Sequence, residues 1–271
     1  MRETTNKQQS FLHAGTLGDT IYAMNVVNIL GGGDVYIQLN GVNELAWNAY
    51  GAVNAGPHAG RYTREDLDFL FPLLEQQSYV HSLNIWRNEL ITHDLTKNYK
   101  FTEHGPQGWQ GNQTESYALT CGLDINRYKR ELVTLPWLEP VAPIKIPGKT
   151  IVINRTGRYL QGRDPNETAW SDWIDEGLNE VAVFVGTPEE HDQFNRQFNA
   201  SVEYQPVSDM LEMARVIQGC EMFIGNQSMP LAIAIGLGKT FWCESRQDWD
   251  NFRSPHGYGD VWFPRVNGFY F

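Results

Sequence analysis

The chain of 271 residues has only three cysteines, Cys121, Cys220 and Cys243, which are far apart in the sequence. An odd number at such distances provides neither a disulfide framework nor the paired spacing of a zinc site, and it suits a reducing compartment. Free cysteine is among the most buried residue types, so we expect three small core residues.

Long apolar runs are also absent. No stretch approaches the roughly 18 apolar residues that a membrane span requires, and the chain does not open on a basic segment followed by an apolar one. We therefore expect a soluble, cytoplasmic protein. Hydrophobic residues make up 41% of the chain and aromatic residues 13%, which is enough for a packed globular core.

Positive charge is scarce, since 21 Lys and Arg residues stand against 32 Asp and Glu residues, for a formal net charge of -11. Nonspecific nucleic-acid binding depends on a positive face that neutralises phosphates, so this balance disfavours such a partner unless a local basic patch exists. Residues 127–130 are the only basic cluster of note. Such a cluster is also typical of a solvated helix end.

Several catalytic motifs are missing as well. The seven histidines show no H-x-x-x-H or H-E-x-x-H spacing, and neither a G-x-S-x-G turn nor a P-loop occurs. Hydrolase triads and ATP-driven transfer therefore lack support. We expect no metal ion and no cofactor.

The order of apolar runs predicts an α/β fold. Residues 10–30 read as a strand, a glycine-containing turn and a helix, and a second strand follows at 34–39. This β-α-β opening implies a parallel sheet. The same alternation restarts at residues 150–154, with further apolar strands at 181–185 and 221–224.

A proline-rich stretch separates these two halves. Pro136, Pro140, Pro143 and Pro147 lie close together, and prolines at that density favour an extended connector. The last residues are aromatic and apolar, and they would be a liability if left in water. We predict a first Rossmann-like domain over residues 1–140 and a second one over residues 148–255. Residues 256–271 would form a tail that packs back on the first domain.

Three loops at the carboxyl ends of predicted strands carry residues that suit a ligand. The first contains Gly15, Gly18 and Asp19 between a strand and a helix. Glycines there allow a close approach of the backbone, and a helix start favours an anion. Asp is also a preferred helix cap, so the local sequence supports a structural role for Asp19 as well.

The second loop contains Asn154, Arg155 and Thr156, with Arg163 a few residues later. Guanidinium groups directly after a strand suit a diphosphate, which they bind in bidentate fashion. Surface arginines on a solvated loop would give the same pattern.

The third loop contains Asn226, Gln227 and Ser228, again between a strand and a helix. Its backbone N–H groups and small polar side chains suit a phosphate or a ribose, while Ser228 is equally suited to cap the helix. Three such loops, divided between two halves, together indicate a ligand site, but they do not identify a reaction.

Four motifs, in this order, resemble those of glycosyltransferase family nine, whose familiar members are lipopolysaccharide heptosyltransferases. They are GTLGDTIYA, INRTGRY, FVGTPEEHDQF and FIGNQSMPLAIAIGLGKT. The resemblance spans most of the chain and is loosest between about residues 40 and 140. It implies a GT-B fold, in which two Rossmann-like domains, here an acceptor side and a nucleotide-sugar side, face a cleft.

The resemblance also implies roles for individual residues. Asp19 would be the general base that deprotonates an acceptor hydroxyl. The donor-binding residues would be Gly15, Gly18, Asn154, Arg155, Thr156, Arg163, Gly186, Glu190, Asn226, Gln227 and Ser228. Among these, the Arg155 loop would face the diphosphate and Glu190 the ribose or base. Where the family has D-S-G-x-x-H, this chain continues from Gln227 as Ser228-Met229-Pro230, so the family's acidic residue and histidine are both missing, which disfavours a heptose donor.

The resulting hypothesis is a metal-independent transferase that moves a sugar from a nucleoside-diphosphate sugar to an acceptor hydroxyl. The acceptor would be a glycan, a small metabolite or a modified nucleobase, the last as in compact viral enzymes that modify DNA. A non-catalytic nucleotide-sugar-binding protein of the same fold is the alternative from a different class.

Overall fold

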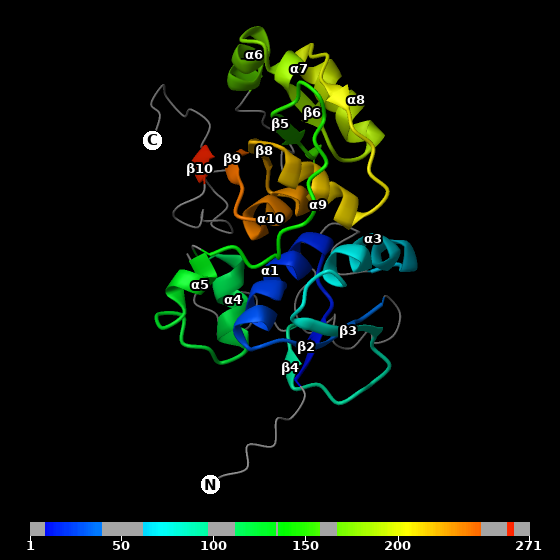
Figure 1. Cartoon of the computed structure of the whole chain (residues 1–271), viewed down its shortest axis with the longest axis vertical. Helices are drawn as coiled ribbons and strands as arrows, with labels where there is room; N and C mark the ends of the chain where they lie inside the picture. Colours follow the sequence, from blue (N-terminus) through cyan, green and yellow to red (C-terminus); the bar gives the residue numbers. More distant parts are fainter. Residues whose placement is uncertain are drawn as a thin grey trace.

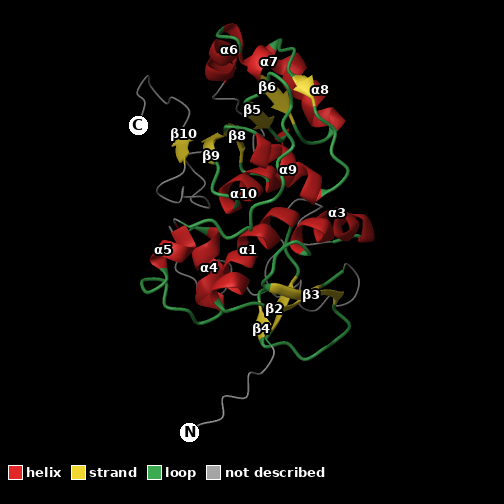
Figure 2. Ribbon diagram, viewed as in Figure 1, coloured by secondary structure: helices red, strands yellow, loops and turns green. Residues whose placement is uncertain are grey.

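Two parallel β-sheets, each packed with helices, make up the protein (Figure 1). The computed structural model describes residues 9–39, 62–96, 112–133, 135–157, 167–244 and 259–262. Figure 2 shows that helices of the N-terminal half lie against helices of the C-terminal half, between the two sheets. The predicted α/β fold with two parallel sheets is confirmed.

The N-terminal sheet has the strand order β3-β2-β1-β4 with every pair parallel. Gly31 and Gly32, with φ of 89° and 84°, end the first helix in a conformation that other residues rarely adopt. The elements of this half are β1 (Ser10–His13), α1 (Leu17–Ile29), β2 (Gly33–Ile37), α3 (Arg64–Leu74), β3 (Val80–Ile85), β4 (His93–Asp94), α4 (Gln113–Thr120) and α5 (Lys129–Val133).

The C-terminal sheet has the order β10-β9-β8-β5-β6-β7, and its pairs are also parallel. Its elements are β5 (Ile151–Asn154), α6 (Glu167–Asp175), α7 (Leu178–Val181), β6 (Ala182–Phe184), α8 (Pro188–Phe198), β7 (Glu203–Tyr204), α9 (Met210–Gly219), β8 (Met222–Asn226), α10 (Met229–Gly236), β9 (Thr240–Glu244) and β10 (Gly259–Trp262). None of the described helices is long and apolar enough to cross a membrane.

Four residues of the predicted tail lie in the described part of the chain. Residues 259–262 form β10, which pairs with β9 at the edge of the C-terminal sheet. A segment of this kind satisfies its backbone hydrogen bonds by extending an open sheet edge. Residues 256–258 and 263–271 lie outside the described part of the chain.

Alternate residues of the C-terminal strands face two different cores, as strand geometry requires. Val152 of β5 faces α9 and α10, whereas Ile153 faces the aromatic side chains of α6 and α8. The first of these cores is continuous with that of the N-terminal half. The two halves therefore share one hydrophobic core.

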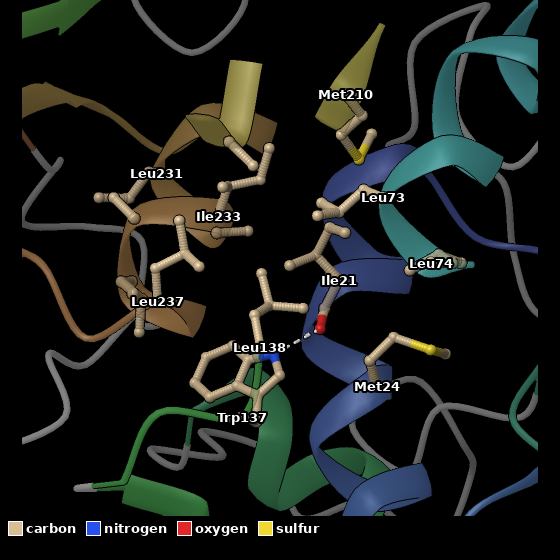
Figure 3. Packing of buried hydrophobic residues seen from close by; sticks show 14 of the residues in the cluster. Ile21, Met24, Leu73, Leu74, Trp137, Leu138, Met210, Leu231, Ile233 and Leu237 are labelled. Carbon is tan, nitrogen blue, oxygen red and sulfur yellow. Dashed lines mark hydrogen bonds between the residues drawn. The ribbon is translucent and has the colours of Figure 1, made fainter. Parts of the chain in front are cut away.

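This shared core lies where α1 packs on α10 and α3 packs on α9 (Figure 3). The connector contributes Trp137, whose indole N–H donates to the carbonyl oxygen of Ile21 within α1 at 2.8 Å. The backbone N–H groups of Trp137 and Leu138 both donate to the carbonyl oxygen of Gly236 at the end of α10. The connector thus ties one helix of each half together.

We predict that Leu73→Ala destabilises both halves at once. Leu73 is fully buried in the shared core, so the substitution should lower the free energy of unfolding by about 2–5 kcal/mol. Hydrogen exchange of peptides from β2 and from β8 should accelerate in parallel. The exposed Asp68→Ala on the same helix is the control, with a change below about 0.5 kcal/mol. Loss of protection in β2 alone would show that the halves unfold independently.

Candidate functional site

The two sheets reverse their strand order at a central strand. In the N-terminal sheet β1 lies between β2 and β4, and in the C-terminal sheet β5 lies between β6 and β8. Open α/β sheets bind ligands beyond the carboxyl ends of the strands at such a reversal. The turn after β1 and the loops after β5 and β8 therefore define the candidate site.

The turn after β1 and the loop after β8 lie side by side. A Cβ on Gly18 would lie 3.4 Å from the Cα and 3.6 Å from the backbone nitrogen of Met229. Gly18 is in the first turn of α1, and Met229 is the first residue of α10. The structure thus brings the Gly15–Asp19 turn next to the loop that contains Asn226, Gln227 and Ser228.

Asp19 is the third residue of α1 and forms a capping box with Thr16, so the local alternative of Asp19 as the cap itself is wrong. Thr16 is the cap residue, and its hydroxyl accepts from the Asp19 backbone N–H. In return, Oδ2 of Asp19 accepts from the backbone N–H of Thr16 at 3.1 Å and from its hydroxyl at 2.9 Å. Oδ1 forms no hydrogen bond with another described residue. One carboxylate oxygen is held in place, and the other is left for a further partner.

The turn wraps over the buried imidazole of His13. The backbone N–H of Gly15 donates to Nδ1 of His13 at 3.1 Å, and a Cβ on Gly15 would lie 2.5 Å from Cε1 of that ring. Glycine at position 15 therefore leaves room for the His13 ring, and its expected role in binding a ligand stays a prediction. Nε2 of His13 lies 2.9 Å from the hydroxyl of Tyr117 in α4.

Burial lowers the pKa of His13 from 6.5 to about 4, although the carboxylates of Asp19 and Asp94 act in the opposite direction. The ring is 1% exposed, and a charge there would lose its hydration. The same burial raises the pKa of Tyr62, whose hydroxyl donates to the Thr16 carbonyl at 2.8 Å. The side chains of His13 and Tyr62, which lie behind the turn, are therefore uncharged at neutral pH.

Asn226 is paired with the protein backbone. Its Oδ1 accepts from the backbone N–H of Thr156 at 3.1 Å, and its Nδ2 donates to the Thr156 carbonyl at 2.7 Å. The side chain is buried, and both its polar atoms take part in this pairing. Asn226 thus joins the loop after β5 to the end of β8, and its expected contact with the donor phosphates stays a prediction.

Arg155, which the sequence assigned to a diphosphate, is engaged by groups inside the protein. Its Nε and one terminal nitrogen donate to the two carboxylate oxygens of Glu244, at 2.7 and 3.1 Å, and Nη1 donates to Gln197 at 3.0 Å. The guanidinium group also lies over the ring of Phe198. Arg155 is 5% exposed, so a bidentate carboxylate inside the protein occupies the fork that the sequence assigned to a diphosphate.

Two polar atoms at this edge of the sheet have no partner among the described residues. Nδ2 of Asn154 donates to the Val185 carbonyl, but the Asn154 Oδ1 accepts nothing, although the residue is 2% exposed. The Ser228 hydroxyl is buried and unpaired at the start of α10, and it makes no capping bond. Buried polar groups are normally paired, so each of these two atoms is left to pair with a water molecule or a ligand group.

Gly186 and Glu190 lie beside Asn154. A Cβ on Gly186 would approach Glu190 Oε2 to 2.7 Å and Asn154 Nδ2 to 2.8 Å, so only glycine fits there. Glu190 is half-buried and closes a capping box with Thr187 at the start of α8. Gln227 is half-buried, and Arg163 lies outside the described residues.

Sequence reasoning missed three residues that shape the site, namely His13, Tyr117 and Glu244. His13 and Tyr117 are 104 residues apart, and Arg155 and Glu244 are 89 residues apart, so no local pattern links them. The available signal was a polar residue at the end of an apolar strand, which applies to both His13 and Glu244. Within the described part of the chain, no three His, Cys, Asp or Glu side chains are grouped to hold a metal ion.

No family model matches this sequence, and no curated protein is significantly similar to it. The solved structures do show a likeness. The glycosyltransferase family 9 protein from Veillonella parvula superposes with a TM-score of 0.57 at 11% identity, over 97% of this chain and 87% of that one.

The second similar protein is TibC, an iron-containing dodecameric glycosyltransferase from enterotoxigenic E. coli. It superposes with a TM-score of 0.56 at 13% identity, over 97% of this chain and 64% of TibC. TibC in complex with ADP-D-beta-D-heptose gives a TM-score of 0.54 at 14% identity, over 96% of this chain and 63% of TibC. This chain therefore spans less than two thirds of TibC.

These similarities define the fold class as that of the GT-B glycosyltransferases. Within that class, the chain has the fold of the family 9 enzymes.

We predict that His13 makes stability depend on pH. Its pKa is about 4 in the folded protein and 6.5 when unfolded, so the unfolded chain binds more protons between these values. Stability should fall as the pH drops from 6.5 to 4, by about 3 kcal/mol in total. Urea unfolding at several pH values should give a flatter dependence for His13→Asn. Equal slopes for the two proteins would contradict a buried neutral ring.

Arg155→Met should destabilise the protein by about 3–5 kcal/mol, because it removes the cation that neutralises the buried Glu244 carboxylate, to which Trp170 also donates. The double variant Arg155→Met with Glu244→Leu should recover most of that loss. Chemical unfolding of the three proteins measures this coupling. If Arg155→Met kept its stability and instead lost nucleotide affinity, Arg155 would be a ligand and not a structural residue.

Proposed function

We propose that the protein is a glycosyltransferase that moves a sugar from a nucleoside-diphosphate sugar to a hydroxyl of its acceptor, without a metal ion. The observation that carries this proposal is the contact of Gly18 with Met229. This contact places the turn that contains Asp19, in the N-terminal half, beside the start of α10 in the C-terminal half. Each of these lies where the strand order of its own sheet reverses. The GT-B fold supports the proposal, since the similar structures are those of glycosyltransferases.

The start of α10 is the proposed site for the donor diphosphate. The helix dipole favours an anion there, with the N–H groups of Met229 and Leu231 in the first turn although Pro230 has none, and the Ser228 hydroxyl is free to donate to a phosphate oxygen. TibC, which has the same fold, is described with a nucleotide sugar, ADP-D-beta-D-heptose. By analogy we assign a nucleotide sugar to this protein and leave its sugar and base open.

Asn154 is assigned to a different part of the donor. Its orphaned atom is a carbonyl oxygen, which accepts hydrogen bonds and would be repelled by an ionised phosphate. A hydroxyl of the ribose or of the sugar can donate to it. Glu190 lies next to Asn154, so both acceptors suit the same hydroxyl-rich region of the donor.

Asp19 is the proposed general base. Thr16 holds Oδ2, and Oδ1 is available to take the proton from the acceptor hydroxyl. The acceptor oxygen then bonds to the anomeric carbon while the bond from that carbon to the diphosphate oxygen breaks. The charge released on the diphosphate is stabilised by the start of α10 and not by Arg155, which is paired with Glu244. The acceptor is a glycan or a hydroxylated small molecule.

We predict that Asp19→Asn abolishes turnover and spares donor binding. The amide keeps the shape of the carboxylate but cannot take up the acceptor proton. A panel of nucleoside-diphosphate sugars should first identify a donor by thermal shift, since a ligand at 100 times its dissociation constant adds about 2.7 kcal/mol. Release of nucleoside diphosphate then measures turnover. Full turnover by Asp19→Asn would remove Asp19 from the reaction, and binding without turnover by the native protein would contradict an enzyme.

Ser228→Ala should weaken the affinity for the same donor about 10- to 100-fold, because it removes a hydrogen bond to a charged group. Isothermal titration of both proteins gives the ratio. Ser208→Ala, at an exposed position beside α9, is a control for which we expect unchanged affinity. Equal affinities of Ser228→Ala and the native protein would place the diphosphate elsewhere.

A further inference from the structure

The Gly15–Asp19 turn contains the proposed base, and its shape depends on a residue that precedes it. His13 is the last residue of β1, and its ring lies under the turn, where Nδ1 accepts from the backbone N–H of Gly15. A Cβ on Gly15 would lie 2.5 Å from Cε1 of His13 and 3.0 Å from Cβ of Asp19. The imidazole and the Asp19 side chain therefore flank the same point of the backbone.

The hydrogen bonds define the proton position on this ring. A backbone N–H can only donate, so Nδ1, which receives the Gly15 N–H at 3.1 Å, carries no proton. In a neutral imidazole the proton is then on Nε2, which donates to the Tyr117 hydroxyl at 2.9 Å. The Thr20 hydroxyl lies 3.0 Å from Nδ1, on the same side as the turn.

The surroundings keep the ring neutral. His13, Tyr62 and Tyr117 are all 2% exposed or less, and the charged groups that face the ring are Asp19 and Asp94. Although these carboxylates favour protonation of His13, desolvation outweighs them. Nδ1 therefore remains an acceptor at neutral pH. A protonated ring, by contrast, would lose the hydrogen bond from the Gly15 N–H.

We propose that His13 is a positioning residue for Asp19, which fixes the turn by accepting the Gly15 N–H at Nδ1 and so directs the Asp19 carboxylate toward the acceptor hydroxyl. This inference rests on the proposed function, because it presupposes that Asp19 is the base. His13 itself touches neither substrate. Its effect is on the alignment of Asp19, and misplacement of a catalytic group by about 1 Å can cost about 100-fold in rate.

Two substitutions separate this role from simple packing. His13→Asn places an amide oxygen near the position of Nδ1 and keeps an acceptor for Gly15, whereas His13→Gln reaches Tyr117 and leaves the Gly15 N–H without one. Positioning predicts that His13→Asn retains kcat within a few-fold, while His13→Gln loses about 10- to 100-fold with little change in KM for the donor. A role in filling volume predicts the reverse order, because Gln is closer to His in size.

The experiment measures kcat, KM and donor affinity of the native protein and both variants, with the donor found by thermal shift. Equal or higher kcat for His13→Gln, with native turnover present, overturns the positioning role and leaves the proposed function intact. Absence of donor binding and turnover in the native protein refutes the function, and the inference with it. Nitrogen-15 NMR of the native protein tests the geometry without a variant: it should show His13 neutral at pH 7 with its proton on Nε2, and a proton on Nδ1 overturns the proposal.

Discussion

The candidate site depends on the apolar packing of α1 against α10. Helix α1 starts directly after β1, the central strand of the N-terminal sheet. Helix α10 starts directly after β8, which neighbours the central strand β5 of the C-terminal sheet. Their packing therefore brings the ends of β1 and β8 together. The contact is close because Gly18 has no side chain to separate it from Met229. Because the surrounding core is continuous across the halves, the relative position of Asp19 and Ser228 is set by buried hydrophobic surface. Any loosening of that core would therefore act on the site.

Residues that look like ligands in the sequence often serve the scaffold. The Arg155 fork is matched by Glu244, and the Asn226 amide is matched by the backbone of Thr156. The Asn226 pair joins the ends of the neighbouring strands β8 and β5, and the Arg155–Glu244 pair joins the loop after β5 to the end of β9, across β8. A rigid edge of this kind is what a phosphate-binding loop needs. The atoms that we propose for the ligand are fewer: the unpaired Ser228 hydroxyl, the unpaired Asn154 carbonyl oxygen, and the Asp19 oxygen that Thr16 does not hold.

The sequence predicts the alternating strands and helices well, because each apolar run and its glycine stop are local signals. It also places the three loops correctly at carboxyl ends of parallel strands. It does not predict the short strands β4 and β7, which have two residues each, nor the position of β10, which depends on an available sheet edge. Pairings such as His13 with Tyr117 are also beyond it, since they arise only when distant elements fold together.

A crystal structure of the protein with a bound nucleoside-diphosphate sugar would test the account most directly. The account predicts the diphosphate at the start of α10 within hydrogen-bonding distance of Ser228. It also predicts a donor hydroxyl on Asn154, and the anomeric carbon on the side that faces Asp19. A nucleotide bound away from both helix starts, or a diphosphate held by Arg155 after its release from Glu244, would contradict it.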